Sequence, residues 1–279
     1  MRKNYGLPYQ GSKNQIAEEI IDFLPSGNRL VDLFGGGGGI SHCASLSGKW
    51  NIIYYNELLP IVADAFKMAI NGEFDNEDRW ISREEFHRLK DIDPYVAICY
   101  SFNYNMKVYA YSPEMEVFKK ALYYKMVFND DSYMTDEILH WIQTDERDMR
   151  KPQNLRALNR IKEIGKDNLS NITVHCGDYS DYSYRKGDVV YCDIPYEGTD
   201  CRKYKGFDNK EFYNWVASRP YQVFFSSYEI SDDRFFTVWK KEKTLFCSNT
   251  AQSGKRGETT EYIYSNQPYK KENKFIFGV

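Results

Sequence analysis

A run of five glycines between a strand pattern and a helix pattern most constrains what this chain folds into. Leu30–Phe34 is an apolar strand pattern, Gly35–Gly39 follows without a break, and Ile40–Leu46 has the pattern of a helix. Only glycine lets the backbone approach a ligand this closely at a helix N-terminus, where the partial positive charge favours an anionic group. Strand, glycine turn and helix together predict an α/β fold with a ligand site at the turn.

The residues around the glycines narrow the ligand to a nucleoside. No Gly-Lys-Ser/Thr follows them, which excludes a nucleotide-hydrolysing phosphate loop, and the spacing departs from the dinucleotide pattern G-x-G-x-x-G. A second strand pattern, Asn51–Tyr55, ends in Asn56 and Glu57, about 20 residues past the glycines. Polar side chains at that place reach ribose hydroxyls. We therefore expect Asn56 or Glu57 to bind a ribose.

Another strand pattern ends in a carboxylate, a proline and an aromatic ring. Val189–Cys192 is an apolar run, and Asp193, Ile194, Pro195 and Tyr196 follow it. Because ligands bind beyond the carboxyl ends of strands in open α/β sheets, these residues are candidates for catalysis. They suit methylation of an amine: Asp193 and the Ile194 carbonyl accept the amine protons and orient the lone pair, while Tyr196 stacks on the base. The alternative is an ordinary strand that ends at a capping Asp and a Pro.

These motifs, taken in order, resemble those of a known enzyme family. Asp32–Gly38 is similar to the cofactor loop of amino-methyltransferases that use S-adenosylmethionine, and Asp193–Tyr196 is similar to their Asp-Pro-Pro-Tyr motif. Leu7–Ile16 resembles the opening segment of Dam-like N6-adenine DNA methyltransferases, and the motif order is their alpha arrangement. Further matches are His175–Tyr179, Ser226–Tyr228 and Glu261–Asn266. Ile194 stands where the family has proline, but a backbone carbonyl is available from either residue.

The resemblance implies a Rossmann-like class I methyltransferase sheet with helices on both faces, plus an inserted, mainly helical lobe. Residues 1–57 and 170–279 are then the catalytic domain, and residues 58–169 are a target-recognition insertion. Helix patterns at Pro113–Leu122 and Pro152–Ile161 agree with a helical insertion. The implied activity is transfer of methyl from S-adenosylmethionine to N6 of an adenine flipped out of double-stranded DNA.

The same resemblance implies roles for individual residues. The residues expected to bind the cofactor are Tyr9, Lys13, Asp32, Phe34, Gly36, Gly38, Asn56 or Glu57, Asp178 and Asp193. Asp32 is expected to hold the cofactor's ammonium and Asp178 to face its adenine. Phage-type members have segments similar to Tyr100–Asn105 and Gln153–Ile161. The candidate DNA contacts are Asn103, Asn105, Lys107, Arg147, Arg150, Lys151 and Arg156.

Composition adds limits on partners and location. With a net charge of −3, any DNA-binding face must be locally basic. The six cysteines form no C-x-x-C pair and the four histidines lie far apart, so we expect neither a metal site nor disulfides. No long apolar run indicates a membrane span, and a cytoplasmic protein of a bacterium or a phage-infected host cell is expected. A cognate restriction endonuclease is a candidate partner. The 24 tyrosines divide between core packing and stacking on bases in a proportion that composition leaves open.

Two kinds of alternative stay open. One is methylation of a different amine, on cytosine N4, an RNA adenine or a protein glutamine, although an aspartate at position 193 favours adenine. The other is a degenerate methyltransferase that binds DNA or cofactor without catalysis, of which Ile194 would be the sign. The enzymatic hypothesis requires the turn at Phe34 and the strand tip at Asp193 to share one hollow.

Overall fold

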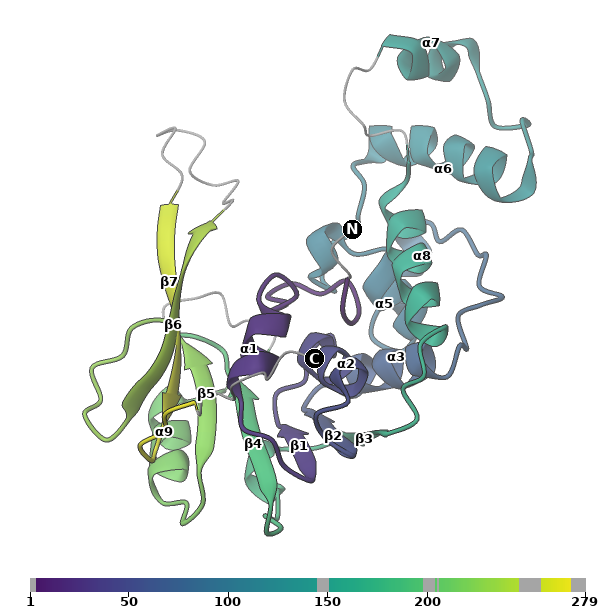
Figure 1. Ribbon diagram of the computed structural model, residues 1–279. Helices are drawn as coiled ribbons and strands as arrows, with labels where there is room; N and C mark the ends of the chain where they lie inside the picture. The colour runs from purple at the N-terminus through teal and green to yellow at the C-terminus, as the bar shows by residue number, and fades with distance from the viewer. Residues whose placement is uncertain (1–3, 145–150, 198–203, 205, 246–256, 272–279) are drawn as a thin grey trace, which may run out of the picture.

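The computed structural model describes residues 4–144, 151–197, 204, 206–245 and 257–271, and a seven-stranded sheet forms its centre (Figure 1). The strands are β1 (Arg29–Asp32), β2 (Ile52–Glu57), β3 (Ile172–Cys176), β4 (Asp188–Asp193), β5 (Val223–Ser227), β6 (Phe236–Leu245) and β7 (Gly257–Ser265). Their order across the sheet is β3-β2-β1-β4-β5-β7-β6. Neighbours from β3 to β5 pair in parallel, whereas β7 runs antiparallel to β5 and β6. The sheet is thus the mainly parallel one that an α/β fold requires.

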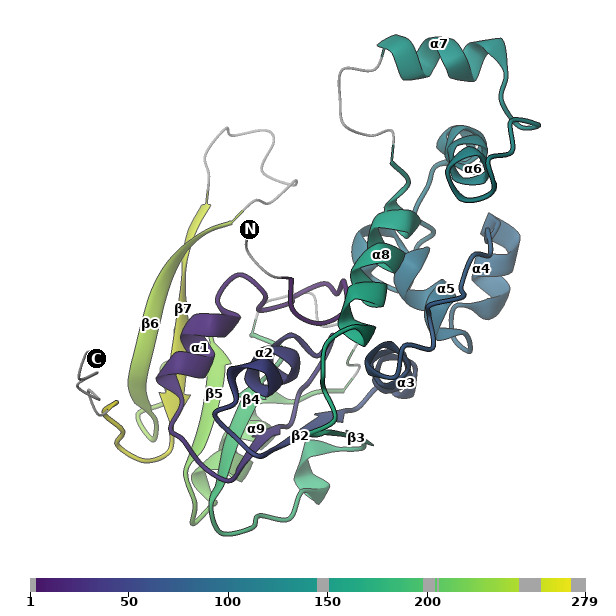
Figure 2. The same cartoon turned by 45° about the vertical axis from the view of Figure 1, so that its right-hand side comes forward.

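Helices cover both faces of this sheet and extend beyond one end of it (Figures 1 and 2). They are α1 (Ala17–Phe23), α2 (Gly39–Ser47), α3 (Pro60–Ile70), α4 (Arg83–Leu89), α5 (Pro94–Cys99), α6 (Pro113–Phe128), α7 (Asp136–Thr144), α8 (Gln153–Gly165) and α9 (Asn209–Ala217), with short 3-10 turns η1 (Phe102–Tyr104) and η2 (Tyr179–Asp181). α1 and α2 lie on one face and α9 on the other, while α4 to α8 form a helical lobe beside the sheet. This arrangement confirms the predicted fold class.

Strand side chains alternate between two apolar cores. On β4, Val190 and Cys192 pack in the core beneath α9, whereas Val189 and Tyr191 pack in the larger core beneath α1 and α2. Successive side chains of a strand point to opposite faces, so a strand covered on both faces must be apolar throughout. This burial explains the uninterrupted apolar run that precedes Asp193.

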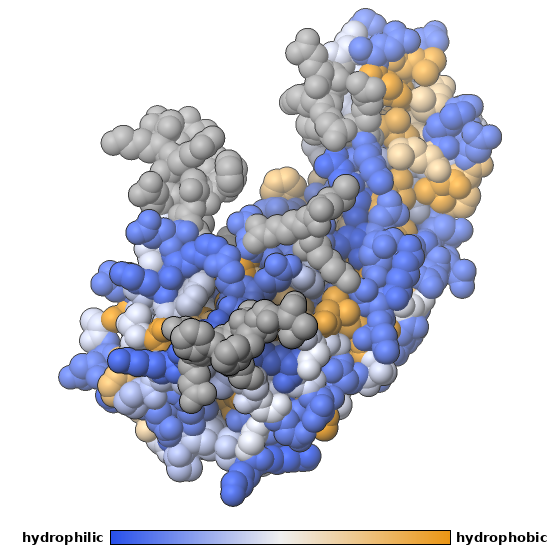
Figure 3. All heavy atoms as spheres, in the orientation of Figure 1, coloured by the Kyte–Doolittle hydropathy of each residue, from blue (hydrophilic) through white to orange (hydrophobic). Residues whose placement is uncertain are grey.

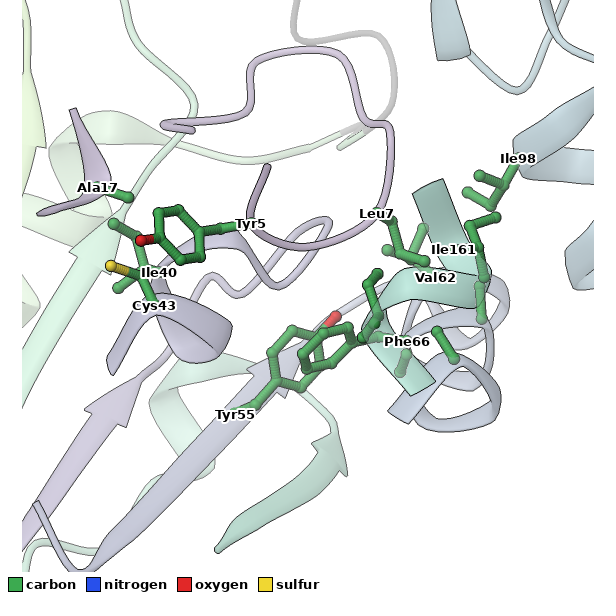
Figure 4. Close-up of a cluster of buried hydrophobic side chains, with 14 of the residues drawn as sticks. Tyr5, Leu7, Ala17, Ile40, Cys43, Tyr55, Val62, Phe66, Ile98 and Ile161 are labelled. Atoms are coloured by element: carbon green, nitrogen blue, oxygen red, sulfur yellow. The ribbon is translucent and has the colours of Figure 1, made fainter. Parts of the chain in front are cut away.

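The N-terminal segment is embedded between the sheet helices and the lobe. Tyr5 packs beside Ile40 of α2, while Leu7 lies among Val62 of α3 and Ile161 of α8 (Figure 4). Burying two large side chains at the start of the chain stabilises a segment that has no regular secondary structure. Residues that follow this segment, including Tyr9 and Lys13, are thereby brought to the carboxyl edge of the sheet.

Hydrogen bonds fasten the same segment on two sides. The amide of Leu7 donates to the Gly37 carbonyl at 2.7 Å. Arg160 of α8 donates to the carbonyls of Tyr5 and Gly6 at 2.7 and 2.9 Å. Burial lowers the pKa of this arginine, since much of its guanidinium is removed from water. A desolvated cation of the lobe therefore holds the segment against the glycine turn.

Tyrosines form much of the core of the helical lobe. Tyr100, Tyr109 and Tyr123 are fully buried there. The hydroxyls of Tyr100 and Tyr109 donate to the carbonyls of Arg79 and Ile81, each at 2.8 Å. These three rings serve packing, which is one of the two roles that composition left open for the tyrosines.

One helix of the predicted insertion belongs to the sheet layer. α3 lies within residues 58–169, yet it packs against β2 and β3 as well as against α5 and α8. The lobe therefore packs against the sheet layer through α3 in addition to being connected to it along the chain.

Apolar side chains gather on the outer part of the lobe (Figure 3). Val117, Met126 and Phe128 of α6 and Leu139 of α7 are all exposed. Among the helices of the described residues, none has the length and apolar character needed to cross a bilayer.

Candidate active site

The glycine turn between β1 and α2 lies directly on aromatic rings. A Cβ atom at Gly35 would lie 2.2 Å from the ring of Tyr55, and one at Gly38 would lie 2.2 Å from the ring of Phe66. Gly38 also has a φ of 74° where it begins α2. Neither position accepts a side chain, because the space is filled and the conformation at Gly38 favours glycine. The turn therefore presents bare backbone to the space above the sheet.

Asp32 ends β1 beneath this turn as a buried carboxylate. Its Oδ2 accepts a hydrogen bond from Ser41 at 2.7 Å, whereas Oδ1 has no hydrogen-bond partner among the described residues. Burial raises the pKa of Asp32 to about 7, and the negative charges of Asp193 and Glu57 add to the effect. An unpaired buried carboxylate oxygen is costly unless a cation or donor meets it. The site is therefore suited to a ligand with a positively charged group.

A cavity of about 400 Å³ joins the glycine turn to the tip of β4. β1 and β4 are parallel neighbours with Asp32 beside Tyr191, so their carboxyl ends open on one edge of the sheet. Phe34 and Asp193 both line the cavity, as the enzymatic hypothesis requires. Its lining also includes the candidates Tyr9, Lys13, Asp32, Gly36, Ile194, Pro195 and Tyr196. The candidates Gly38, Asn56, Glu57 and Asp178 are not part of the lining.

The residues after β4 form a fixed corner of this cavity. Ile194 is buried in the core beneath α9, so an isoleucine at this position contributes apolar packing that proline would reduce. Asn209 of α9 donates to the Pro195 carbonyl at 2.9 Å and holds the turn. The departure from the family's proline at the second motif position therefore has a packing reason in this chain.

Lys13 pairs with the carboxylate at the β4 tip. Its Nζ lies 2.9 Å from Asp193 Oδ1 and 4.5 Å from the centre of the Tyr196 ring. Glu261 of β7 lies 3.2 Å from the same Nζ. Burial alone would lower the pKa of Lys13, but the attraction of Asp193 and Glu261 outweighs it and raises that pKa. The side chain is therefore an ammonium that sits between two carboxylates.

Tyr196 is held by its hydroxyl and by its ring. The hydroxyl donates to the Glu261 carboxylate and lies 3.3 Å from Asp193 Oδ1. The ring meets that of Tyr228 edge to face, with 4.8 Å between their centres. Burial raises the pKa of Tyr196 well above its ordinary value, so the hydroxyl is a donor at neutral pH.

Asn56 and Glu57 make different kinds of hydrogen bonds, which distinguishes the two candidates for binding a ribose. The Asn56 amide donates to the carbonyls of Leu33 and Gly177 at 3.1 and 3.0 Å, and its oxygen lies 2.7 Å from His175 Nδ1. All of its polar atoms are thus used to join the ends of neighbouring strands.

Glu57 instead accepts hydrogen bonds from two residues that themselves line the cavity, Gly36 and Tyr204. Its carboxylate receives the amides of Gly36 and Leu59, each at 2.9 Å, and the Tyr204 hydroxyl at 3.2 Å. Burial raises the pKa of Glu57. Because the Tyr204 side chain is the only one of these partners that can move away without unfolding the turn, Glu57 is the better candidate for a ribose.

Asp178 lies in a second hollow of about 510 Å³, together with Asn56 and His175. Its Oδ1 accepts from the amide and the hydroxyl of Ser180, at 2.8 and 2.6 Å, where η2 begins. The ring of Phe34 stacks on Tyr179, with centres 5.2 Å apart. Asp178 therefore lines the second hollow and not the main cavity, while its neighbour Tyr179 contacts Phe34 of the main cavity.

The candidate DNA contacts that the structure describes are not part of the cavity lining. Asn103 and Lys107 are exposed, whereas Asn105 accepts the amides of Lys107 and Val108 at 2.8 and 3.0 Å and so shapes the loop. Arg156 is exposed, and its guanidinium donates to the carbonyl of Lys151 at 2.9 and 3.1 Å. Arg147 and Arg150 lie outside the described residues.

The cavity residues to which the sequence analysis gave no role include Tyr204, Tyr228 and Glu261. The hydroxyl of Tyr204 lies 3.0 Å from that of Tyr9. Tyr228 and Glu261 fall in segments that resemble the family, so their position in those motifs was the available signal. Tyr204 had none, because it lies outside all of the motifs that resemble the family.

The described residues do not meet the requirements of a metal site. Among the described residues, no group of three or more His, Cys, Asp and Glu side chains is arranged to hold a metal ion. The cavity is instead lined by carboxylates, one ammonium and aromatic rings.

A Rossmann-like sheet whose glycine turn and acidic strand tip share one cavity defines a class of α/β enzyme that brings a nucleoside cofactor to a second substrate. A family model, D12 class N6 adenine-specific DNA methyltransferase, matches residues 9–274, and the chain belongs to this family. The protein is therefore an enzyme of adenine-specific DNA methylation, and the resemblance found in the motifs is confirmed. The match gives no support to cytosine or RNA as the substrate. A comparison with curated proteins finds no match.

Proposed function

We propose that this enzyme transfers the methyl group of S-adenosylmethionine to N6 of an adenine that has been rotated out of double-stranded DNA. The observation that carries the proposal is the one cavity that holds both Asp32, with its unpaired carboxylate oxygen, and Asp193 at the β4 tip. A donor bound at the first residue and an amine bound at the second would lie within reach of each other.

The residues around the glycine turn fit the parts of this cofactor. Asp32 would accept its ammonium, and Phe34 and Gly36 would enclose its methionine portion beside Tyr9. Glu57 would take the ribose hydroxyls once the Tyr204 hydroxyl has moved aside. When bound, S-adenosylmethionine supplies an electrophilic methyl group on a positively charged sulfur. Roles in cofactor binding for Gly38, Asn56 and Asp178 stay predictions from the sequence.

Asp193 and Ile194 would prepare the amine. The Asp193 carboxylate and the Ile194 carbonyl accept the two N6 protons, which turns the lone pair of the nitrogen toward the donor. Lys13, 2.9 Å from Asp193, favours the ionised form that a proton acceptor needs. Asp193 would take the N6 proton that is released when the methyl carbon leaves sulfur for N6, with S-adenosylhomocysteine as the other product.

Tyr196 would hold the flipped base by stacking. Rotating a base out of a duplex costs a few kcal/mol, and stacking on an aromatic ring returns about 1–3 kcal/mol of it. The neutral hydroxyl of Tyr196 is fixed by Glu261, so the ring is oriented before the base arrives. Such orientation reduces the entropy lost on binding.

DNA would be bound between the helical lobe and the sheet. We assign target recognition to residues 58–169 and catalysis to residues 1–57 and 170–279. Figures 1 and 2 show the lobe on one side of the carboxyl edge of the sheet and the β6–β7 hairpin on the other. Phosphates or base edges would be contacted by the exposed candidates Asn103, Lys107 and Arg156 and by the half-buried Lys151.

The substrate also implies where the enzyme works and with whom. Genomic or phage DNA places the protein in the cytoplasm of a bacterium or of a phage-infected host. A cognate restriction endonuclease would be a partner if it cuts the same sequence, because N6 methylation alters the major-groove edge of adenine that such enzymes read. Digestion of methylated and unmethylated plasmid with enzymes of the host tests this part.

A nucleoside analysis tests the proposal. Purified protein is incubated with duplex DNA and methyl-labelled S-adenosylmethionine, and the DNA is hydrolysed and separated by mass. The expected product is N6-methyladenine, and Asp193→Asn should form it at least about 1,000-fold more slowly. Label in cytosine, or an equal rate for Asp193→Asn, would contradict the proposal.

A further inference from the structure

Glu261 is a buried carboxylate at the centre of the site for which no role has been derived. It lies on β7, opposite Lys241 of β6, and its neighbour Tyr262 pairs with Ser227 at the end of β5. This register carries Glu261 just past the carboxyl end of the parallel strands. Only 2% of its side chain is exposed, and it lines the cavity with Asp193.

One oxygen of Glu261 connects two residues that face the substrate. Oε1 lies 3.2 Å from Lys13 Nζ and accepts the hydroxyl of Tyr196. Lys13 in turn contacts Asp193 and lies over the Tyr196 ring. In this group of four residues, Lys13, Asp193, Tyr196 and Glu261, each of the two carboxylates contacts both the ammonium and the hydroxyl.

The Lys13 ammonium contacts two carboxylates rather than one. Asp193 and Glu261 both lie against the buried Lys13 ammonium, and burial of each carboxylate carries a desolvation cost. With Asp193 as its only partner, Lys13 would also draw electron density from the oxygen that must accept the amine proton. Because Glu261 is a second negative charge beside Lys13, the ammonium withdraws less electron density from the Asp193 oxygen.

We propose that Glu261 is a positioning residue for methyl transfer: it fixes the Tyr196 ring for the flipped base and holds Lys13 beside Asp193. The inference rests on the proposed roles of Asp193 and Tyr196. Glu261 acts through these residues and makes no contact with the reacting atoms. The raised pKa of Lys13 agrees with it, because both carboxylates contribute to the rise.

Glu261→Gln tests the inference with little change in shape. Single-turnover methyl transfer should slow by about 10- to 100-fold, while the dissociation constants for S-adenosylmethionine and for DNA change by less than about threefold. Glu242→Gln is the matched control, since Glu242 is an exposed carboxylate on the neighbouring strand of the same hairpin. It should keep the wild-type rate.

Mutant cycles identify the residues through which Glu261 acts. Glu261→Gln is combined with Tyr196→Phe, which removes the hydroxyl and keeps the ring, and separately with Lys13→Met. Each double variant should be less impaired than the product of its two single effects, because the contacts removed are shared. Effects that multiply fully in both cycles would overturn the inference.

The pH profile separates positioning from mere structural support. Asp193, Glu261 and the Tyr196 ring are the groups that face the Lys13 ammonium. Without Glu261, Lys13 loses its proton at a lower pH, so the alkaline limb of the single-turnover rate should begin at a lower pH than in the wild type. A lower rate with an unmoved alkaline limb would indicate only structural support and would contradict the inference.

Two further measurements keep the outcome decisive. If Glu261→Gln does not unfold cooperatively, Glu261→Asp replaces it: the charge is kept but withdrawn by one methylene, and a partial loss of rate is expected, whereas the wild-type rate would overturn the inference. Asp193→Asn is assayed in parallel. An active Asp193→Asn would remove the proposed function itself, whereas an inactive Asp193→Asn with a fully active Glu261→Gln removes only the role of Glu261.

Discussion

The cavity at the strand tips and the outer surface of the helical lobe hold their charged side chains in opposite ways. Asp32 is fully buried with a hydrogen bond from Ser41, and Lys13 is largely buried between two carboxylates. Lys107 and Arg156 of the lobe are exposed. A buried ion costs several kcal/mol unless an opposite group meets it, whereas an exposed ion costs little at any position. A single substitution at the cavity should therefore have a large effect on cofactor binding or catalysis. A single substitution on the lobe should have a small effect on DNA affinity, and several together should add up.

Asp32→Asn should show the largest effect on cofactor binding. Loss of the buried charge that would meet the cofactor's ammonium is expected to weaken S-adenosylmethionine binding by about 100-fold, or roughly 3 kcal/mol. The pKa of Asp32 is raised to about 7 by burial, so wild-type affinity should fall as the pH drops below 7. Asp32→Asn should lack this dependence. Calorimetry from pH 6 to pH 8.5 measures both, and equal affinity at all pH values in the wild type would count against the role.

The same carboxyl group predicts a change in stability with pH. Its pKa of about 7 in the folded state exceeds the ordinary value of 3.8, so the folded state binds this proton more tightly than the unfolded state. The stability it contributes is full below pH 3.8 and is lost as the pH rises through 7. Asp32→Asn should therefore raise the Tm relative to the wild type at pH 8 and much less at pH 4. A difference that is the same at both pH values would contradict this.

Comparing Gly38→Ala with Gly48→Ala should show how much of the loss of stability comes from close contact and how much from backbone strain. Gly38 and Gly48 flank α2 with similar φ values of 74° and 66°, but only at Gly38 would a Cβ atom meet a ring, that of Phe66. We expect Gly38→Ala to destabilise the protein by about 1–3 kcal/mol more than Gly48→Ala. It should also weaken cofactor binding, because the turn must shift. Chemical unfolding of the two variants measures the difference, and equal losses would show that the contact is unimportant.

Arg160 and Arg156 lie one turn apart on α8 and should behave differently. Arg160→Met removes the hydrogen bonds to Tyr5 and Gly6 that hold the N-terminal segment, so cofactor affinity should fall by about 10-fold while DNA affinity changes little. Arg156→Met should weaken DNA binding and leave cofactor affinity unchanged. Calorimetry and fluorescence anisotropy on both variants test the pair. If the two variants shared one profile, the division between cavity and lobe would fail.

Lys107→Ala should show the smallest effect. An exposed lysine that contacts one phosphate is expected to change DNA affinity only about two- to fivefold and to lower the slope of log K against log salt by about 1. Lys166→Ala, an exposed lysine paired with Glu163 at the end of α8, is the control and should change neither. An unchanged slope for Lys107→Ala would remove it from the DNA contacts.

The same contrast explains how far the sequence could predict the site. The apolar run before Asp193 and the strand before the glycines are local patterns, and parallel pairing of their strands suffices to bring Asp32 and Asp193 to one cavity. The hydrogen bond between Glu57 and Gly36 joins the ends of two neighbouring parallel strands, so parallel pairing also predicts that these residues lie close together. The glycine turn was predictable because close packing leaves no alternative residue at Gly35 or Gly38.

The remaining contacts depend on long-range placement that no local pattern records. Glu261 reaches Lys13 only because β7 inserts beside β5 and the N-terminal segment crosses the edge of the sheet. Asp178 resembles the family in sequence, yet it lines the second hollow and not the main cavity. The tyrosines of the lobe, Tyr100 among them, could not be divided between core and base stacking until their burial was known.

The measurement that tests the account most directly asks whether donor and amine are bound side by side. A conjugate that joins the adenosyl moiety of the cofactor to N6 of an adenine nucleoside through a short linker would occupy both ends of the cavity. The account predicts that it binds at least about 100-fold more tightly than the adenosyl moiety alone, and that Asp193→Asn removes most of this gain. A conjugate that binds the wild type no more tightly than the adenosyl moiety would show that the glycine turn and the Asp193 tip do not serve one reaction.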